Sequence, residues 1–317
     1  LGESLDFDFA EVEQLGKVEK NDSYLQKHIA DVLALDLVDA EAVRNANFKV
    51  AVDAVNSTGG LFIPALLEAL GVQTVYKIHC EPNGQFPHNP EPLKEHLTDL
   101  SKAVTENAAD LGIAVDPDVD RLVFMMEDGE LFGEEYTLVA VADYILQHTK
   151  GNTVSNLSST RALRDVTVKH GGEYFAAAVG EVNVVTKMKE VNAVIGGEGN
   201  GGVIYPSSHY GRDALVGVAI FLTHLARLGK KVSAYRAELP QYYMSKNKIT
   251  LTPELDIDNL LAKMEEKYKH EDHSTIDGLK IDFANEWVHL RKSNTEPIIR
   301  IYSEGPTADA AEAIAQK

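Results

Sequence analysis

Three aspartates at alternate positions, Asp116, Asp118 and Asp120, directly follow an apolar run at 111–115, and Arg121 comes next. Alternate side chains of an extended segment can point the same way, so the three carboxylates can converge on one hard cation. Without a counter-charge they would repel one another strongly. Because Mg²⁺ takes oxygen ligands and keeps positions open for substrate phosphate, the spacing predicts a magnesium site. The alternative is an acidic hairpin loop in which Asp118 or Asp120 caps backbone amides.

A glycine-rich segment at 196–202 holds two polar side chains, Glu198 and Asn200, directly after an apolar run at 193–195. Glycine lets the backbone approach a ligand closely and adopt positive φ. A carboxylate accepts hydrogen bonds from two neighbouring sugar hydroxyls, and an amide adds both a donor and an acceptor. No Gly-Lys-Ser/Thr follows, so the segment is not a nucleotide-binding P-loop. The pattern predicts a sugar-binding loop, and the alternative is a glycine-rich turn with a solvated Glu198.

A polar segment at 291–297 lies between apolar runs at 287–290 and 298–302. It combines a guanidinium group, two hydroxyls, an amide and backbone N–H groups within one turn. Arginine can clasp a phosphate dianion with two parallel hydrogen bonds, and a turn of exposed N–H groups adds further donors. The segment therefore predicts a phosphate-binding loop, with a polar hairpin turn as the alternative.

In order and rough spacing, these three segments resemble the metal, sugar and phosphate loops of the α-D-phosphohexomutases. That family comprises phosphoglucomutases, phosphomannomutases and phosphoglucosamine mutases. The shared patterns are Asp-Pro-Asp-x-Asp-Arg, Gly-Glu-x-Asn-Gly and Arg-x-Ser-Asn-Thr-x-Pro. The resemblance implies that Asp116, Asp118 and Asp120 bind Mg²⁺ and that Arg121 is a catalytic residue near the reacting phosphate. It also implies that Glu198 and Asn200 bind the sugar. The second phosphate would be bound by Arg291, Ser293, Asn294 and Thr295.

The resemblance also implies an activity and a missing part. Enzymes of this family interconvert hexose 1-phosphate and hexose 6-phosphate through an enzyme phosphoserine, with hexose 1,6-bisphosphate as intermediate and activator. The family's serine loop reads Ser-His-Asn-Pro, whereas Pro87 here precedes His88-Asn89-Pro90. We therefore expect the phosphoserine to lie in an N-terminal domain of the same protein outside this chain. The chain alone is expected to be inactive.

The substrate and the general base are less well defined. Some relatives place a histidine at positions that hold Gly202 and Glu181 here, so we assign no base. The sugar loop, together with the segment at 179–184, is more similar to phosphoglucosamine mutases or broad-specificity sugar mutases. Two other functions stay open: a non-catalytic sugar-phosphate-binding module and, less favoured, a magnesium-dependent phosphatase with an aspartyl-phosphate. The phosphatase would explain neither the sugar loop nor the phosphate loop.

Strands and helices in a regular order position these loops. Apolar strands with intervening helices between 48 and 115 predict a βαβ unit with parallel pairing. The strand, hydroxyl-rich loop and helix at 153–169 repeat the order at 50–70. A further helix is expected at 214–228, capped by Asp213 and ended by the glycine after it.

From this order we expect an α/β fold with two similar mixed-sheet α/β domains followed by a small α+β C-terminal domain. The expected parts are a connector at 1–20 and domains at 21–130, 131–243 and 244–317, which carry the metal, sugar and phosphate loops respectively.

Composition limits the partners. The 49 acidic and 30 basic residues give a net charge of −19, which argues against binding nucleic acid or an anionic membrane surface. The single cysteine, Cys80, fits a reducing cytoplasm, and no apolar run approaches the length of a transmembrane helix. We expect a cytoplasmic enzyme that binds a hexose phosphate, with its oligomeric state open.

Overall fold

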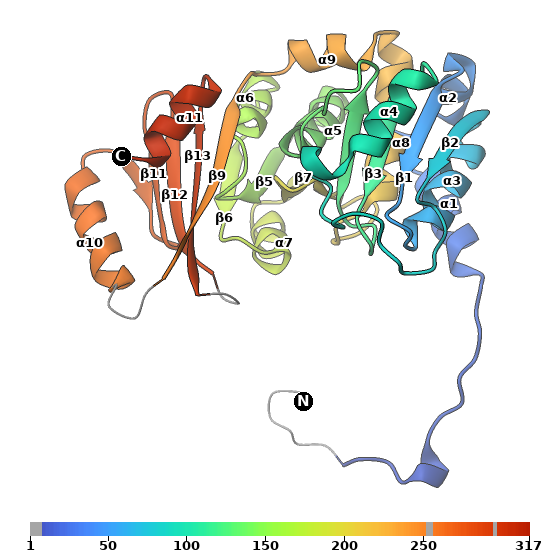
Figure 1. Ribbon diagram of the computed structural model, residues 1–317, viewed down its shortest axis with the longest axis horizontal. Coiled ribbons are helices and arrows are strands. Elements are labelled where there is room, and N and C mark those ends of the chain that lie inside the picture. The colour runs from blue at the N-terminus through green and yellow to red at the C-terminus, as the bar shows by residue number, and fades with distance from the viewer. Residues whose placement is uncertain (1–7, 252–255, 294–296) are drawn as a thin grey trace.

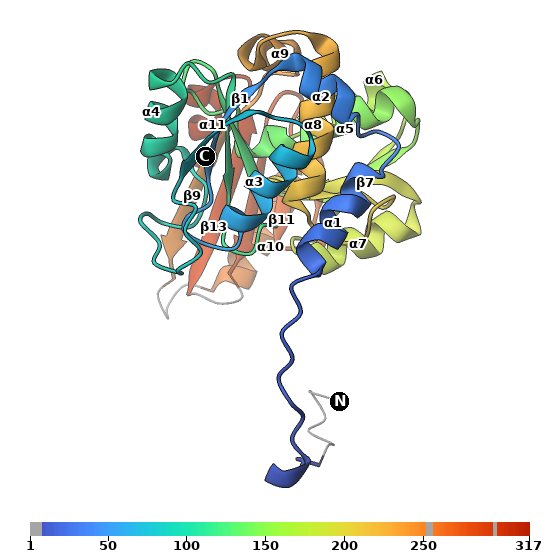
Figure 2. The same cartoon turned by 90° about the vertical axis from the view of Figure 1, so that its right-hand side faces the viewer.

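The computed structural model describes residues 8–251, 256–293 and 297–317. Three sheets stand side by side along its longest axis, and α9 (Val232–Glu238) runs over the second sheet toward the third (Figure 1). The chain from residue 8 to the start of α1 (Tyr24–Leu33) extends away from the folded part and includes the short 3-10 helix η1 (Val12–Gln14) (Figure 2). No helix within these ranges is both long and apolar enough to cross a membrane.

The first sheet and its helices are β1 (Lys49–Asp53), α3 (Gly59–Ala69), β2 (Thr74–Ile78), η2 (Lys94–His96), α4 (Thr98–Glu106), β3 (Leu111–Val115) and β4 (Leu122–Met126). The strand order is β2-β1-β3-β4, with β1 parallel to β2 and β3 and with β4 antiparallel to β3. Successive side chains of β1 and β3 are buried, as in a sheet covered on both faces. Helix α4 packs on one face and α3 on the other.

The second sheet has the same design and consists of α5 (Glu134–His148), β5 (Asn152–Asn156), α6 (Ala162–Lys169), β6 (Tyr174–Ala177), α7 (Glu181–Glu190), β7 (Ala193–Glu198) and β8 (Gly202–Ile204). Its strand order is β6-β5-β7-β8, again with two parallel pairs and one antiparallel edge strand. Helix α7 covers one face with Val184 and Met188, and α5 and α6 cover the other. The expected pair of similar mixed-sheet domains is confirmed.

One large hydrophobic core joins the two sheets through α5 and α8 (Ala214–Leu228). Both helices are buried almost all round, as expected for helices that are apolar on every side. Phe124 of β4 stacks on Phe221 of α8 at a ring-centroid distance of 3.8 Å. From outside, α1 (Tyr24–Leu33) and α2 (Ala40–Ala46) pack against α8. The parts that carry the metal loop and the sugar loop therefore form one packed body.

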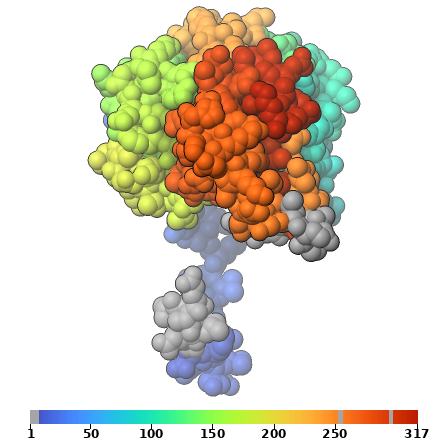
Figure 3. All heavy atoms as spheres, turned by 90° about the vertical axis from the view of Figure 1, so that its left-hand side faces the viewer, coloured from blue at the N-terminus to red at the C-terminus, as the bar shows by residue number. Residues whose placement is uncertain are grey.

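The C-terminal part consists of β9 (Tyr243–Thr250), α10 (Ile257–Tyr268), β10 (Asp272–Ser274), β11 (Leu279–Asp282), β12 (Trp287–Lys292), β13 (Ile298–Gly305) and α11 (Ala308–Ala315). Its sheet is antiparallel throughout, in the order β10-β11-β12-β13-β9, and its core is separate from that of the first two sheets. This is the small α+β domain that the sequence predicted. Figure 3 looks onto this domain, coloured orange to red. Atoms of the part with the second sheet (green to yellow) lie to its left, and atoms of the part with the first sheet (teal) lie to its right.

Candidate active site

The three aspartates of the metal loop lie in a tight turn between β3 and β4. Asp116 Oδ1 accepts hydrogen bonds from the backbone N–H groups of Asp120 (3.1 Å) and Arg121 (3.0 Å), and Val119 adopts a φ of 63°. The turn places one carboxylate oxygen each of Asp116, Asp118 and Asp120 within 4.8 Å of one another. The structure thus brings together the side chains that the spacing predicted to converge.

The electrostatics of this loop suit a divalent cation. Burial, reinforced by the charges of Asp120 and Asp118, raises the pKa of Asp116 to about 7. Burial also raises the pKa of Asp120, whose Oδ1 atom is buried with no hydrogen-bond partner in the described part of the chain. Because Mg²⁺ takes carboxylate oxygens and supplies positive charge, these residues fit a magnesium ion.

The sugar loop holds Glu198 at the end of β7. The side chain is buried, and its Oε1 atom accepts hydrogen bonds from Asn156 Nδ2 (2.8 Å) and Gly180 N (3.2 Å). Asn200 lies in the turn before β8, where its Oδ1 atom accepts a bond from Gly202 N (3.2 Å). These bonds hold both polar groups in fixed positions.

The metal loop and the sugar loop are joined directly. Leu122 N donates to Gly201 O (3.0 Å). Across the same junction, the Arg212 guanidinium binds the carboxylates of Asp120 and Glu198, with 2.9 Å between Nη1 and Glu198 Oε2. Its Nε atom also donates to Glu181 Oε2 (3.2 Å). Sequence reasoning missed this role, because no local pattern relates Arg212 to these acids.

The predicted phosphate loop at 291–297 begins with the last two residues of β12, and three basic side chains form a row at this point. Arg291 of β12 is opposite Arg300 of β13, which in turn is opposite Lys248 of β9. Directly opposed like charges on one face of a sheet repel each other, so the row attracts a negative partner. Asp277 provides one carboxylate, with Oδ2 3.7 Å from Arg291 Nη1. A phosphate dianion suits this row of positive charge.

A cavity of about 550 Å³ collects side chains from all three loops. Arg121 enters it from the metal loop, Glu198 and Asn200 from the sugar loop, and Arg291 from the phosphate loop. The other lining residues are Glu91, Pro92, Leu93, Glu95, Glu134, Glu135, Asn156, Ser158, Val179, Gly199, Lys246, Lys248, Arg300 and Tyr302. Segments that are far apart in the sequence therefore share one site.

The remaining predicted residues lie beside this cavity or outside the described chain. The three aspartates adjoin it through Arg121, whose Nε atom is 3.5 Å from Asp116 Oδ2. Ser293 follows β12, and its backbone N–H donates to Ile298 O (3.0 Å). Asn294 and Thr295 lie outside the described residues.

An acid–base pair lies in the cavity wall. Lys246 Nζ is 3.2 Å from Glu135 Oε1 and 3.0 Å from Glu134 Oε1. Burial raises the pKa of Glu135 to about 7, although the positive charge of Lys246 opposes the shift. A carboxyl group with a pKa near neutrality can both donate and accept a proton. Sequence reasoning missed Lys246 and Lys248, although their spacing places both on one face of a strand.

The chain matches family models over most of its length. Residues 23–129 match the phosphoglucomutase/phosphomannomutase alpha/beta/alpha domain II, residues 133–243 match domain III, and residues 250–317 match the C-terminal domain. The chain belongs to the phosphoglucomutase/phosphomannomutase family. The resemblance to the α-D-phosphohexomutases that the three loops indicated is thereby confirmed.

Relatives in this family carry mutase names. The chain is 36% identical to a phosphoglucomutase/phosphomannomutase of Thermococcus kodakarensis, with 97% of this chain and 67% of that protein covered. It is 30% identical to a probable phosphoglucosamine mutase of Methanopyrus kandleri, with 96% and 67% covered. The crystal structure of a phosphoglucomutase/phosphomannomutase family protein from Burkholderia thailandensis superposes with a TM-score of 0.79 at 27% identity, covering 93% of this chain and 62% of that one. This family member therefore spans roughly two thirds of the length of these relatives.

Proposed function

We propose that the chain carries the metal, sugar and phosphate sites of a phosphohexomutase, which interconverts hexose 1-phosphate and hexose 6-phosphate through a hexose 1,6-bisphosphate. The observation that carries this proposal is the cavity of about 550 Å³, which is lined by Arg121, Glu198 and Arg291 from three separate segments of the chain. The mutase names of the relatives agree with it. We place the protein in cytoplasmic carbohydrate metabolism, with a glucosamine phosphate or a broader range of hexose phosphates as substrate.

Each loop has one task in this proposal. The row of Arg291, Arg300 and Lys248 holds the phosphate that is not transferred, with Ser293, Asn294 and Thr295 as further donors. Glu198 and Asn200 bind hydroxyls of the sugar ring. Asp116, Asp118 and Asp120 hold Mg²⁺, which when bound balances the negative charge of the reacting phosphoryl group. Arg121 orients that group from the cavity side.

In this proposal the nucleophile is the phosphoserine of a Ser-His-Asn-Pro loop, a pattern that these 317 residues do not contain. A phosphoserine gives its phosphoryl group to the free hydroxyl of the bound hexose monophosphate: the serine O–P bond breaks and a sugar O–P bond forms. A base accepts the hydroxyl proton, and the serine oxygen takes up a proton. The bisphosphate then turns so that its other phosphate occupies the basic row, and it returns a phosphoryl group to serine. One basic row therefore serves both isomers.

Phosphorus NMR of the 317-residue chain tests this proposal. With Mg²⁺ and trace hexose 1,6-bisphosphate, we expect the signals of glucose, mannose or glucosamine 1-phosphate to broaden or shift without formation of a 6-phosphate. Arg291→Gln should remove the effect because it interrupts the basic row, whereas Arg44→Gln, at an exposed position on α2, should leave it intact. The absence of any perturbation would contradict the proposed sites. Turnover by the chain alone would contradict the external phosphoserine.

A further inference from the structure

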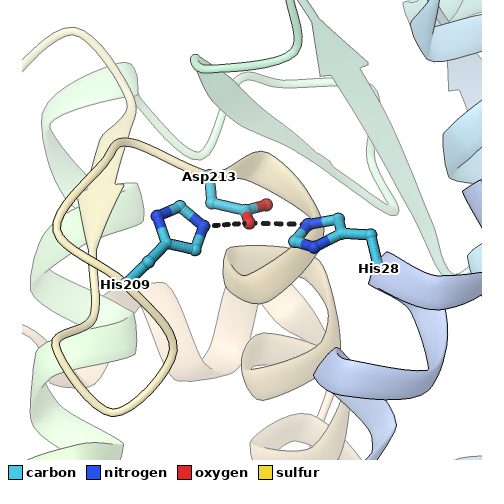
Figure 4. A group of neighbouring side chains, drawn as sticks. All are labelled: His28, His209 and Asp213. Atoms are coloured by element: carbon cyan, nitrogen blue, oxygen red, sulfur yellow. Dashed lines mark hydrogen bonds and ion pairs between the residues drawn. The ribbon is translucent and has the colours of Figure 1, made fainter. Parts of the chain in front are cut away.

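A second cluster of polar side chains lies apart from the cavity, where α1 meets the start of α8. Figure 4 shows two imidazole rings approaching one carboxylate from opposite sides. His28 Nε2 is 2.8 Å and His209 Nε2 is 2.9 Å from the same atom, Asp213 Oδ2. His28 comes from α1, His209 from the loop after β8, and Asp213 from the N-cap of α8. We infer that this cluster is a binding site for a divalent transition-metal ion such as Zn²⁺.

The donor atoms determine the class of metal. Two imidazole nitrogens and one carboxylate oxygen suit Zn²⁺, Co²⁺ or Ni²⁺, whereas the three carboxylates of the metal loop suit Mg²⁺. One donor atom of each residue lies within 4.8 Å of those of the other two. In a tetrahedral zinc site with bonds of about 2.0 Å, neighbouring ligand atoms are about 3.3 Å apart. Admitting the ion would lengthen each Nε2–Oδ2 distance by about half an ångström and turn both ring nitrogens from the carboxylate oxygen toward the ion.

The carboxylate at the centre of the cluster is already fixed. Asp213 Oδ1 accepts hydrogen bonds from the backbone N–H groups of Leu215 (2.8 Å) and Val216 (3.2 Å). These capping bonds leave Oδ2 directed at the two histidines. Because capping and metal binding use different oxygens of one carboxylate, the site costs the helix none of its N-terminal hydrogen bonds.

Solvent can reach the cluster. His28 and His209 have side-chain exposures of 31% and 45%. A separate cavity of about 360 Å³ adjoins the cluster and is lined by His28, Thr58, Phe62, Asp118, Val119, Arg212, Asp213 and Leu215. Three protein ligands leave at least one coordination position of Zn²⁺ open, and this cavity has room for the water that would complete it. The bound ion would tie α1 to the cap of α8.

A second histidine cluster in the same chain is the alternative location for the metal ion. Asp53, His79 and His88 also place one donor atom each within 4.8 Å of the others. There, however, His79 Nε2 pairs with Asp99 (3.2 Å) and not with Asp53, whereas His88 Nε2 lies 3.3 and 3.2 Å from the two oxygens of Asp53. Among the described residues of this group, one imidazole contacts the central carboxylate, whereas two imidazoles contact Asp213.

Metal binding to the chelator-treated chain tests the inference. We would titrate Zn²⁺ by calorimetry and Co²⁺ by visible absorption, both in excess Mg²⁺ so that the metal loop is occupied. The expected result is one Zn²⁺ ion bound per chain, Co²⁺ bands typical of nitrogen and oxygen ligation, and a higher melting temperature. His28→Gln and His209→Gln should each weaken Zn²⁺ binding at least tenfold, because glutamine still donates a hydrogen bond to Asp213 but is a poor ligand.

Two control variants make the result specific. His270→Gln removes an exposed histidine with 69% side-chain exposure, and His88→Gln disrupts the second cluster. Both should bind Zn²⁺ as the parent chain does. The inference is overturned if no Zn²⁺ binds in excess Mg²⁺, or if binding survives both His28→Gln and His209→Gln. Loss of binding in His88→Gln alone would assign the metal to the second cluster and equally overturn it.

Discussion

Arg291, Arg300 and Lys248 place three positive charges side by side on adjacent strands. A sheet selected for stability alone would avoid such a row, because directly opposed like charges repel. Such a row is expected where an anion binds, because a phosphate dianion attracts all three positive charges.

The Lys248→Gln substitution tests whether Lys248 contributes to phosphate binding without contributing to the stability of the fold. We expect the affinity for glucose 1-phosphate to fall about tenfold, because a hydrogen bond to a charged group contributes about 1.5 kcal/mol. The free energy of unfolding should stay constant or rise by up to about 1 kcal/mol, because an opposed like charge is gone. Calorimetry and urea denaturation measure the two quantities. Lys263→Gln, exposed on α10, is the control and should change neither, while a destabilised Lys248→Gln would contradict this account.

At the scale of an element, α8 contains a buried, uncharged histidine. His224 is 3% exposed, and its ring lies 4.7 Å from that of Tyr144 and 4.9 Å from that of Tyr235, measured between centroids. Its Nε2 atom has no hydrogen-bond partner in the described part of the chain. Burial lowers the pKa of His224 to about 4. The helix that joins the two sheets therefore packs best with this ring neutral.

Acid should weaken this packing over a defined range. Between its ordinary pKa of 6.5 and the folded value of about 4, His224 takes up a proton in the unfolded chain but not in the folded one. The contribution of His224 to the free energy of unfolding should therefore fall as pH decreases through this window, by up to about 1.4 kcal/mol per pH unit. His224→Phe keeps an aromatic ring without a titrating group, and urea denaturation should show a flatter dependence. His270→Gln should retain the parent slope, and an unchanged slope in His224→Phe would exclude His224 as the cause.

At the scale of the whole molecule, a buried ionic contact fixes the C-terminal sheet against the second one. Arg161 of the second sheet's loop has 5% side-chain exposure, and its Nη2 atom donates to Glu286 O (2.9 Å) and Asp282 Oδ1 (3.3 Å). Glu304 Oε1 accepts hydrogen bonds from Arg161 N (3.1 Å) and from Trp287 Nε1 (2.8 Å). The basic row lies on the C-terminal sheet. This contact therefore holds the basic row in position relative to the sugar loop.

Arg161→Met should loosen the C-terminal sheet selectively. Removing one partner of a buried ion pair leaves the other uncompensated, and we expect a loss of about 3 kcal/mol. Trp287 is the only tryptophan of the chain and is fully buried at this contact, so its fluorescence reports on the interface. The fluorescence transition should move to a lower temperature than the main loss of circular dichroism. Arg164→Met, at a position of α6 with 44% side-chain exposure, should melt like the parent. Equal melting of both variants would contradict the prediction.

The sequence by itself determined the features that depend on near neighbours. The spacing of Asp116, Asp118 and Asp120 was enough to predict their convergence, because one short turn brings them together. The bounds of α8 followed from the cap at Asp213 and from Gly229, which adopts a φ of 61°. Capping and left-handed backbone involve only the first and last turns of a helix. The repeat of strand, loop and helix likewise predicted two similar sheets.

Only the tertiary structure decided which distant residues meet. Arg212 joins Asp120, 92 positions away, to Glu198. The basic row depends on the register of three strands, and His28 reaches Asp213 only because α1 packs on α8. Strand register and helix packing are set by the burial of whole apolar faces, not by the polar residues that they carry along. The packing of the hydrophobic core therefore brings the site residues together, although most of these residues are not part of that core.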